Sequence, residues 1–298
     1  MCGIVGLLVR DPALEGDLGQ YFSTMLEEMT ARGPDSAGLA IYDRGVDASA
    51  TRYSLRTDNP NANWSAVKAE VEAATGTSAA IDINGHVAFL TTSAPAADVH
   101  TALAASEEQI IVVGEGHAMS LIKDVGLPGE ICERYDVSDV TGYMALGHTR
   151  MATESAVTID GAHPFSPRPD LALVHNGSFS NHATIRRQLA DAGINCITQN
   201  DTEVCAQYIG WRMAEGDTLE DAMRHVLKEF DGFFTLVVST QNAFSVVRDA
   251  FACKPMVVAE TDQYVAVASE YHALAGLPGI ENARVFEPQP EEIHTWTV

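Results

Sequence analysis

The chain has 298 residues, and its apolar fraction of 46% and charged fraction of 20% are those of an ordinary globular protein. With 18 basic and 41 acidic residues it carries a formal charge of −23, which repels phosphate backbones and anionic lipid and argues against nucleic acid and membrane partners. Its five scattered cysteines form no C-x-x-C pair, so neither a disulfide framework nor a structural zinc site is indicated.

The start of the chain lacks the pattern of a signal peptide, because the apolar run from Gly3 to Val9 is short and has no basic flank. No segment approaches the roughly 20 apolar residues that a membrane-spanning helix needs. We therefore expect a cytoplasmic protein.

The first part of the chain predicts two buried strands, at residues 2–9 and 37–42, with a helix between them. The helix is indicated by apolar residues at helical spacing, namely Leu18, Phe22, Met25, Leu26 and Met29.

A stretch from residue 53 to residue 116 predicts a separate inserted unit. Its predicted elements are strand 53–56, helix 65–74, strand 80–83, strand 87–92, helix 97–105 and strand 109–113. The two middle strands meet at Asn84-Gly85, a strong hairpin signal. The order β-α-β-β-α-β matches the ferredoxin-like split motif. We therefore expect a main domain over residues 2–298 that carries an inserted α/β subdomain at 53–116.

The second half of the chain predicts helices and strands in separate blocks. The predicted elements are strand 172–175, helices 183–192, 203–214 and 219–229, and strands 233–239, 243–248, 256–260 and 264–268. Asp201 or Thr202 and Thr218 are plausible N-caps for the second and third helices. Blocks of this kind, without strict alternation, favour an α+β fold.

Cys2 is the first residue with a chemical role to consider. A small residue at position 2 allows the initiator Met1 to be removed, which leaves Cys2 with a thiol and a free α-amine. An α-amine has a pKa of roughly 7.7–8.0, so much of it is a neutral base at neutral pH. One residue can then supply both nucleophile and base. A buried, inert cysteine on a core strand is the alternative, and taken alone it is the more common case.

Six short motifs, which follow one another along the chain, favour the nucleophilic interpretation of Cys2 over the inert one. They are Cys2–Gly6 (CGIVG), Arg32–Gly38 (RGPDSAG), Gly147–Thr153 (GHTRMAT), His175–Gly177 (HNG), Asn200–Glu203 (NDTE), and Arg248-Asp249 with Lys254-Pro255. In this order they resemble the class II glutamine amidotransferases, which include glutamine phosphoribosylpyrophosphate amidotransferase, glucosamine-6-phosphate synthase and glutamate synthase. The resemblance implies a four-layer αββα N-terminal-nucleophile hydrolase fold, here with the ferredoxin-like unit inserted, and a Cys2 thioester that releases ammonia from L-glutamine.

The resemblance also implies roles for the residues around Cys2. Attack on the glutamine amide creates an oxyanion, and Asn176 and Gly177 are the expected donors, through a side-chain amide and a backbone N–H. Arg150 offers a planar fork for the substrate α-carboxylate. Asp201 is expected to bind the substrate α-amine, kept ionised by the start of a helix.

Supporting residues are expected around these groups. By the same resemblance, Thr153 and His163 are expected to contact the substrate. Arg32, Asp35, Arg248, Asp249 and Glu270 are expected to be structural. The ten histidines show no metal-ligand spacing, so no metal site is predicted.

Three features depart from the family pattern. Met151 follows the substrate arginine where many relatives have an aromatic residue, and Asn200 stands where serine is common. The interval between Cys2 and Arg150 is also about double that of simpler relatives, which the inserted unit explains.

No acceptor domain is recognisable after Arg248, so we expect ammonia to pass to a separate synthase chain in a hetero-oligomer. Residues 147–155 (GHTRMATES) and 175–182 (HNGSFSNH), with the insertion, resemble the glutaminase-type subunit of N-methylglutamate synthase, a glutamate synthase-like enzyme of methylamine metabolism. That resemblance implies that FMN and an iron–sulfur cluster reside on the partner, and no cofactor on this chain. Two alternatives remain: a γ-glutamyl-transferring or acylase N-terminal-nucleophile enzyme, and a non-catalytic scaffold.

Overall fold

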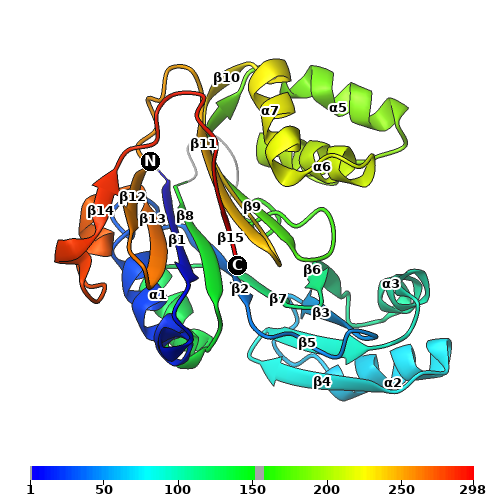
Figure 1. Ribbon diagram of the computed structural model, residues 1–298. Coiled ribbons are helices and arrows are strands. Elements are labelled where there is room, and N and C mark those ends of the chain that lie inside the picture. Colours follow the sequence, from blue (N-terminus) through cyan, green and yellow to red (C-terminus); the bar gives the residue numbers. More distant parts are fainter. Residues whose placement is uncertain (1, 152–157) are drawn as a thin grey trace.

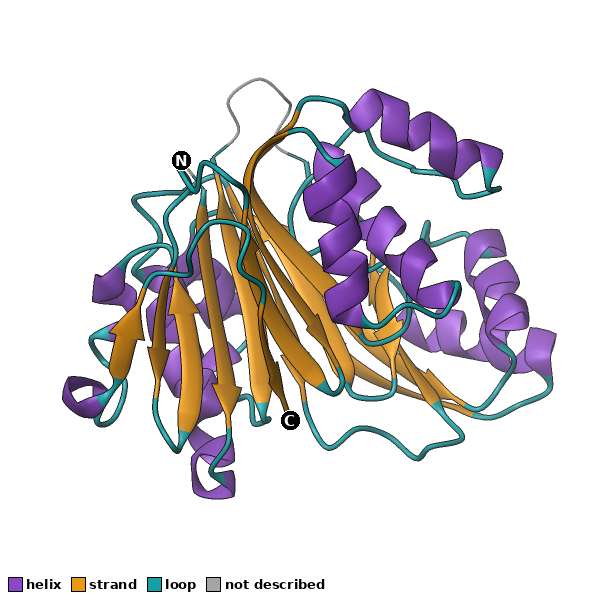
Figure 2. Cartoon of the chain, turned by 45° about the horizontal axis from the view of Figure 1, so that its top comes forward, coloured by secondary structure: helices purple, strands orange, loops and turns teal. Residues whose placement is uncertain are grey.

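Two β-sheets stacked face to face, with helices on both outer sides, form the body of the protein (Figures 1 and 2). The structure is a computed structural model that describes residues 2–151 and 158–298. In both stacked sheets, the described neighbouring strands run antiparallel. This arrangement confirms the predicted α+β, αββα fold.

The first sheet has seven strands. In spatial order they are β14 (Arg284–Phe286), β12 (Val257–Glu260), β13 (Tyr264–Ala268), β1 (Gly3–Val9), β8 (Met144–Arg150), β2 (Ser36–Tyr42) and β7 (Met119–Val125). The second sheet has the order β15 (His294–Thr297), β11 (Ala243–Arg248), β10 (Gly232–Thr240) and β9 (Leu171–Phe179).

Strand β1 shows why its sequence is apolar at nearly every position. Successive side chains of a strand point to opposite faces of the sheet. Val5 and Leu7 pack in the core beneath the outer helices, whereas Ile4 and Leu8 pack in the core between the two sheets. Because both faces are covered, all seven residues of the strand are buried.

The outer layers come from separate parts of the chain. Helices α1 (Leu18–Glu27) and α4 (Pro128–Arg134) pack on the seven-stranded sheet. Helices α5 (His182–Asp191), α6 (Asp201–Ala214) and α7 (Leu219–Glu229) cover the four-stranded sheet. Short 3₁₀ turns lie at Pro12–Asp17, Val137–Asp139, Tyr271–Leu274 and Ile280–Asn282.

The inserted unit is a third sheet with two helices and its own apolar core. In chain order its elements are β3 (Thr51–Arg56), α2 (Trp64–Thr75), β4 (Ala79–Asn84), β5 (Val87–Thr92), α3 (Ala96–Ala105) and β6 (Ile111–Gly116). The strand order β4-β5-β3-β6, antiparallel throughout, is that of the predicted ferredoxin-like split motif. Figure 1 shows the unit beside β2 and β7, which form one edge of the seven-stranded sheet.

A buried carboxylate joins the inserted unit to the body. Asp124 on β7 accepts hydrogen bonds from Arg56 of β3 (3.3 Å), from Arg134 of α4 (2.6 Å) and from the Tyr135 hydroxyl (2.7 Å). Its side chain is only 7% exposed, so these donors replace water around the charge. This cluster holds three elements in one relative position.

Two local predictions differ from the structure. The predicted cap of α6 is wrong: Asn200, and neither Asp201 nor Thr202, is the N-cap, and its side chain accepts from the Thr202 N–H. Asp201 lies in the first turn, and its carboxylate accepts from the Phe179 N–H. The predicted strand 172–175 is also longer, since β9 continues to Phe179. The HNG motif therefore lies within a strand.

Candidate active site

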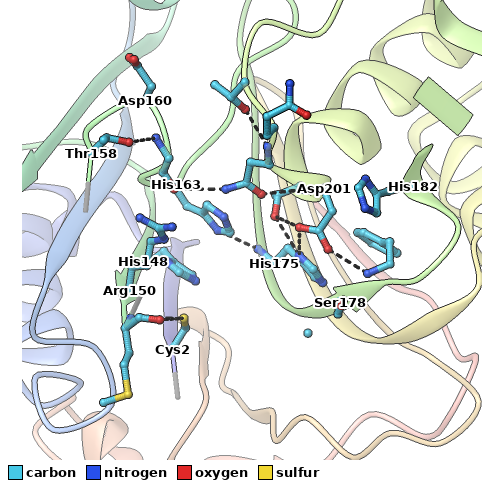
Figure 3. Close-up of a pocket in the computed structure, with 18 of the residues that line it drawn as sticks. Cys2, His148, Arg150, Thr158, Asp160, His163, His175, Ser178, His182 and Asp201 are labelled. Atoms are coloured by element: carbon cyan, nitrogen blue, oxygen red, sulfur yellow. Dashed lines mark hydrogen bonds and ion pairs between the residues drawn. The ribbon is translucent and has the colours of Figure 1, made fainter. Parts of the chain in front are cut away.

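A cavity of about 580 Å³ opens where β1 begins and β8 and β9 end, near the start of α6. Figure 3 shows Cys2 and Arg150 on one side of it and Asp201 on the other. The described lining residues are Cys2, His148, Arg150, Met151, Thr158, Asp160, Gly161, His163, His175, Gly177, Ser178, Phe179, Ser180, His182, Thr198, Gln199, Asn200, Asp201 and Thr202. Its size is typical of small-molecule sites. The fold thus brings residues of four of the six sequence motifs together around one cavity.

Cys2 is held from its backbone, so its sulfur has a defined position. Its carbonyl oxygen accepts from Arg32 Nε (2.9 Å) and from Asn176 Nδ2 (3.1 Å). Its Sγ accepts from the Met151 N–H at 3.5 Å and lies 3.9 Å from the Met151 carbonyl oxygen. The residue is partly exposed on the cavity, whereas the alternative of an inert core cysteine would require full burial.

Arg32 helps to position Cys2 through its hydrogen bond to the Cys2 carbonyl oxygen. Besides Cys2, it pairs with Glu270 at 2.6 Å. Asp249 accepts from the Phe234 N–H (2.9 Å), and Arg248 donates to the carbonyl oxygen of Pro288 (3.1 Å). These contacts are those of structural residues, as expected from the sequence.

Asn176 is fixed by three neighbours. Its Oδ1 accepts from His148 Nε2 (3.1 Å), while its Nδ2 donates to the Cys2 carbonyl oxygen and to Ser269 Oγ (3.2 Å). This pattern directs the NH₂ group toward Cys2. Both of its hydrogens are engaged, so the predicted oxyanion role requires one bond to be exchanged for the substrate oxygen.

Gly177 follows Asn176 in a backbone conformation that other residues rarely adopt, with φ of +140°. A Cβ at this position would lie 2.0 Å from the carbonyl oxygen of Phe233 on the neighbouring strand β10. Only glycine therefore fits here, and its backbone lies on the cavity wall.

Arg150 and Asp201 supply opposite charges to the same cavity. Arg150 is the last residue of β8, and Asp201 opens α6, where the positive end of the helix dipole favours a carboxylate. The Asp201 carboxylate also accepts from the Phe179 N–H at 2.9 Å. A cation and an anion across one cavity fit an amino acid, with its α-carboxylate and α-amine.

Three buried histidines form a stack beneath this cavity. The rings of His148 and His163 have centroids 4.1 Å apart, and those of His163 and His175 are 6.5 Å apart. His175 Nδ1 is 2.9 Å from the Thr202 hydroxyl oxygen. Burial lowers the pKa of His148 to about 3 and that of His175 to about 4, and it holds the pKa of His163 well below its usual value. All three rings are therefore neutral at pH 7.

The predicted substrate contacts have different outcomes. His163 lines the cavity, mostly buried, and its Nδ1 accepts from the His175 N–H at 3.4 Å. Thr153 lies outside the described residues. His148 and His175 received no role from the sequence, although both lie inside quoted motifs, because their burial and ring stacking depend on strands far apart in the chain.

Within residues 2–151 and 158–298, no three His, Cys, Asp or Glu side chains are grouped as a metal site. In the same part of the chain, no helix has the length and apolar character that crossing a bilayer requires.

Comparison with known proteins defines the family. A model of the glutamine amidotransferase domain matches residues 137–287. The glutamine amidotransferase-like protein GlxB of Rhizobium meliloti is 48% identical over 99% of this chain and 98% of its own length. A Methanothermobacter thermautotrophicus protein named for the same family is 32% identical over the whole of both chains. The chain therefore belongs to the glutamine amidotransferase family.

A solved structure supports the fold independently. The glutamine phosphoribosylpyrophosphate amidotransferase of Bacillus subtilis aligns with a TM-score of 0.63 over 99% of this chain and 47% of its own, at 20% identity. With the N-terminal-nucleophile fold and the family match, the chain is a class II glutamine amidotransferase, a family whose general activity is glutamine hydrolysis with ammonia transfer.

Proposed function

We propose that Cys2, after removal of Met1, is the nucleophile that releases ammonia from L-glutamine bound in this cavity. The observation that carries the proposal is that the Cys2 sulfur lines the same cavity as Arg150 and Asp201. Glutamine would place its α-carboxylate at the Arg150 fork and its α-amine at Asp201. Its side-chain amide would then extend toward Cys2.

The reaction follows from these positions. The neutral α-amine of Cys2 accepts the thiol proton, and the thiolate attacks the amide carbon of glutamine. The oxyanion that forms is stabilised by the Gly177 N–H and by Asn176, which exchanges one of its two bonds. The protonated amine gives its proton to the leaving nitrogen, ammonia departs and a thioester remains. Water then cleaves the thioester to glutamate and restores the thiol.

Replacing Cys2 tests this assignment. Cys2→Ala is expected to abolish glutamine hydrolysis and leave the fold intact, because a partly exposed side chain is removed. Cys253→Ala, at an exposed cysteine, is the matched control and should retain full activity. Unchanged ammonia release by Cys2→Ala would exclude the nucleophile role. A scaffold would be the better account if the unaltered chain released no ammonia from glutamine.

We further propose that the ammonia passes to a separate synthase chain, in a complex of the N-methylglutamate synthase or glutamate synthase-like kind. Residues 147–155 and 175–182 and the inserted unit support this partner by resemblance. FMN and an iron–sulfur cluster would then reside on the partner. Co-purification from the native host should recover a flavin-containing chain, and recovery of this chain alone would contradict the proposal.

Product analysis separates hydrolysis from γ-glutamyl transfer. With glutamine and methylamine, the isolated chain should form glutamate and ammonia. γ-Glutamylmethylamine in place of glutamate would instead assign the chain to γ-glutamyl transfer.

A further inference from the structure

A second cavity lies beside the candidate active site, at the junction of the inserted unit and the body. Its volume is about 270 Å³. Asp160 and Thr198 line both cavities, so the two are neighbours. Its other lining residues come from β6, β7, the segment before β9, the loop before α6 and α6 itself. They are Ile111, Val112, Val113, Lys123, Phe165, Ser166, Pro167, Ile197, Glu203, Ala206 and Gln207.

Lys123 is a buried cation in this cavity. The residue is 6% exposed, and its Nζ makes two long hydrogen bonds, to the carbonyl oxygens of Ala162 (3.3 Å) and Pro164 (3.4 Å). Nζ also lies 5.0 Å from the centroid of the Phe165 ring. In the described part of the chain, no carboxylate oxygen lies within ion-pair distance of Nζ. A buried ammonium without a counter-ion is unfavourable.

The carboxylates near this cation do not neutralise it directly. Glu203 is occupied by other donors, since it accepts from the Ile197 N–H (2.6 Å) and from the N–H and hydroxyl of Thr198 (both 2.6 Å). Asp160 is exposed at the rim. The remaining wall residues are mostly apolar, and Val113 and Ala206 are examples. The cavity therefore offers one buried positive charge within an apolar surround.

We propose that this cavity binds a small monocarboxylate with an apolar body. Its carboxylate would pair with Lys123 and its hydrocarbon part would contact the apolar walls. The exposed Asp160 and the net charge of −23 disfavour ligands with several negative charges. Because Lys123 bonds the carbonyls on either side of His163, and Thr198 lines both cavities, occupancy would also affect the glutamine cavity.

The pH dependence of binding follows from the surroundings of Lys123. Burial lowers its pKa to about 8, Arg56 lowers it further, and Asp160 and Glu203 raise it. The nearby His163 ring is neutral, because burial lowers its pKa. Carboxylate binding requires the protonated lysine, so affinity should be constant from pH 6 to 7 and fall above about pH 8.

Ligand-observed NMR titration with pentanoate and its uncharged analogue pentanamide tests the site directly. At pH 7 the chain should bind pentanoate roughly tenfold more tightly than pentanamide. Lys123→Met should abolish this preference, whereas Arg150→Met, which removes the cation of the glutamine cavity, should keep it. A preference that persists in Lys123→Met, or that is absent from the start, would overturn the proposal.

A surface variant keeps the test decisive if Lys123→Met fails to fold. Ile197 is 92% exposed at the rim, so Ile197→Glu adds a negative charge without disturbing the core and should weaken pentanoate binding selectively. Ile83→Glu, at a 51% exposed position on the opposite edge of the inserted sheet, is the matched control. Equal pentanoate binding by the two variants would contradict the site. Because the readout is binding, it does not depend on the proposed hydrolysis.

Discussion

The stack of His148, His163 and His175 should make the folded protein sensitive to mild acid. Each ring is buried and neutral, and burial holds each pKa well below the usual value of 6.5. A histidine whose pKa is depressed on folding binds a proton more readily in the unfolded chain. Its contribution to stability is therefore complete above pH 6.5 and is lost as the pH falls below that value.

The size of this loss of stability follows from the difference between the pKa of each histidine in the unfolded chain and its lower pKa in the folded protein. At pH 5.5, one unit below the unfolded pKa, each neutral histidine costs about 1.4 kcal/mol of stability, so three cost about 4 kcal/mol. This is a large part of the roughly 5–15 kcal/mol that stabilises a typical domain. His100 acts in the opposite direction, because a hydrogen bond to Glu115 raises its pKa.

Urea unfolding followed by circular dichroism at pH 7.5, 6.5 and 5.5 measures this effect, in a window above the titration of ordinary carboxylates. The free energy of unfolding should fall by about 4 kcal/mol between pH 7.5 and 5.5. The His100→Gln variant should show a slightly steeper fall. A free energy that changes by less than about 1 kcal/mol would refute the neutral stack.

Three further outcomes are expected from single substitutions. Arg150→Lys should raise KM for glutamine roughly tenfold with little change in kcat, because a point charge replaces the planar fork; an unchanged KM from steady-state kinetics would contradict this. His148→Leu should lower kcat by roughly 10²-fold, since Asn176 loses the bond that orients its amide, and His148→Gln, which keeps a donor, should recover part of it; equal rates for both variants would argue against an orienting bond. Asp124→Ala should lower the free energy of unfolding by about 3–5 kcal/mol, because it removes the buried acceptor that Arg56, Arg134 and Tyr135 share. Asp58→Ala, at a side chain 80% exposed, should change it by less than about 0.5 kcal/mol in the same urea experiment, since Arg56 keeps its bond to Asp124.

Much of the fold was predictable because its signals are local. The helix α1, the hairpin at Asn84-Gly85 and the cap at Thr218 each depend on residues within a few positions of one another. Strands β7 and β8 were not predicted. Both carry polar side chains into buried positions, such as Lys123 and His148, and this burial depends on partners distant in sequence.

The candidate site was predictable mainly through the motifs, which the family resemblance assigned to one pocket. The sequence placed Cys2, Arg150 and Asp201 far apart, and only strand pairing brings β1 next to β8. The bonds of Asn176 to His148 and Ser269 could not be predicted, because they join residues up to 93 positions apart. The second cavity could not be predicted, because Glu203 is the one described lining residue that belongs to a motif, and its wall is formed where the inserted unit meets the body.

Trapping the covalent intermediate tests the central claim most directly. The chain is mixed with glutamine, quenched in acid during turnover and analysed by peptide mass spectrometry. We expect an N-terminal peptide that lacks Met1 and carries one γ-glutamyl group on Cys2, with no adduct in Cys2→Ala. Glutamine hydrolysis by a chain that retains Met1, or an adduct on any other residue, would contradict the account.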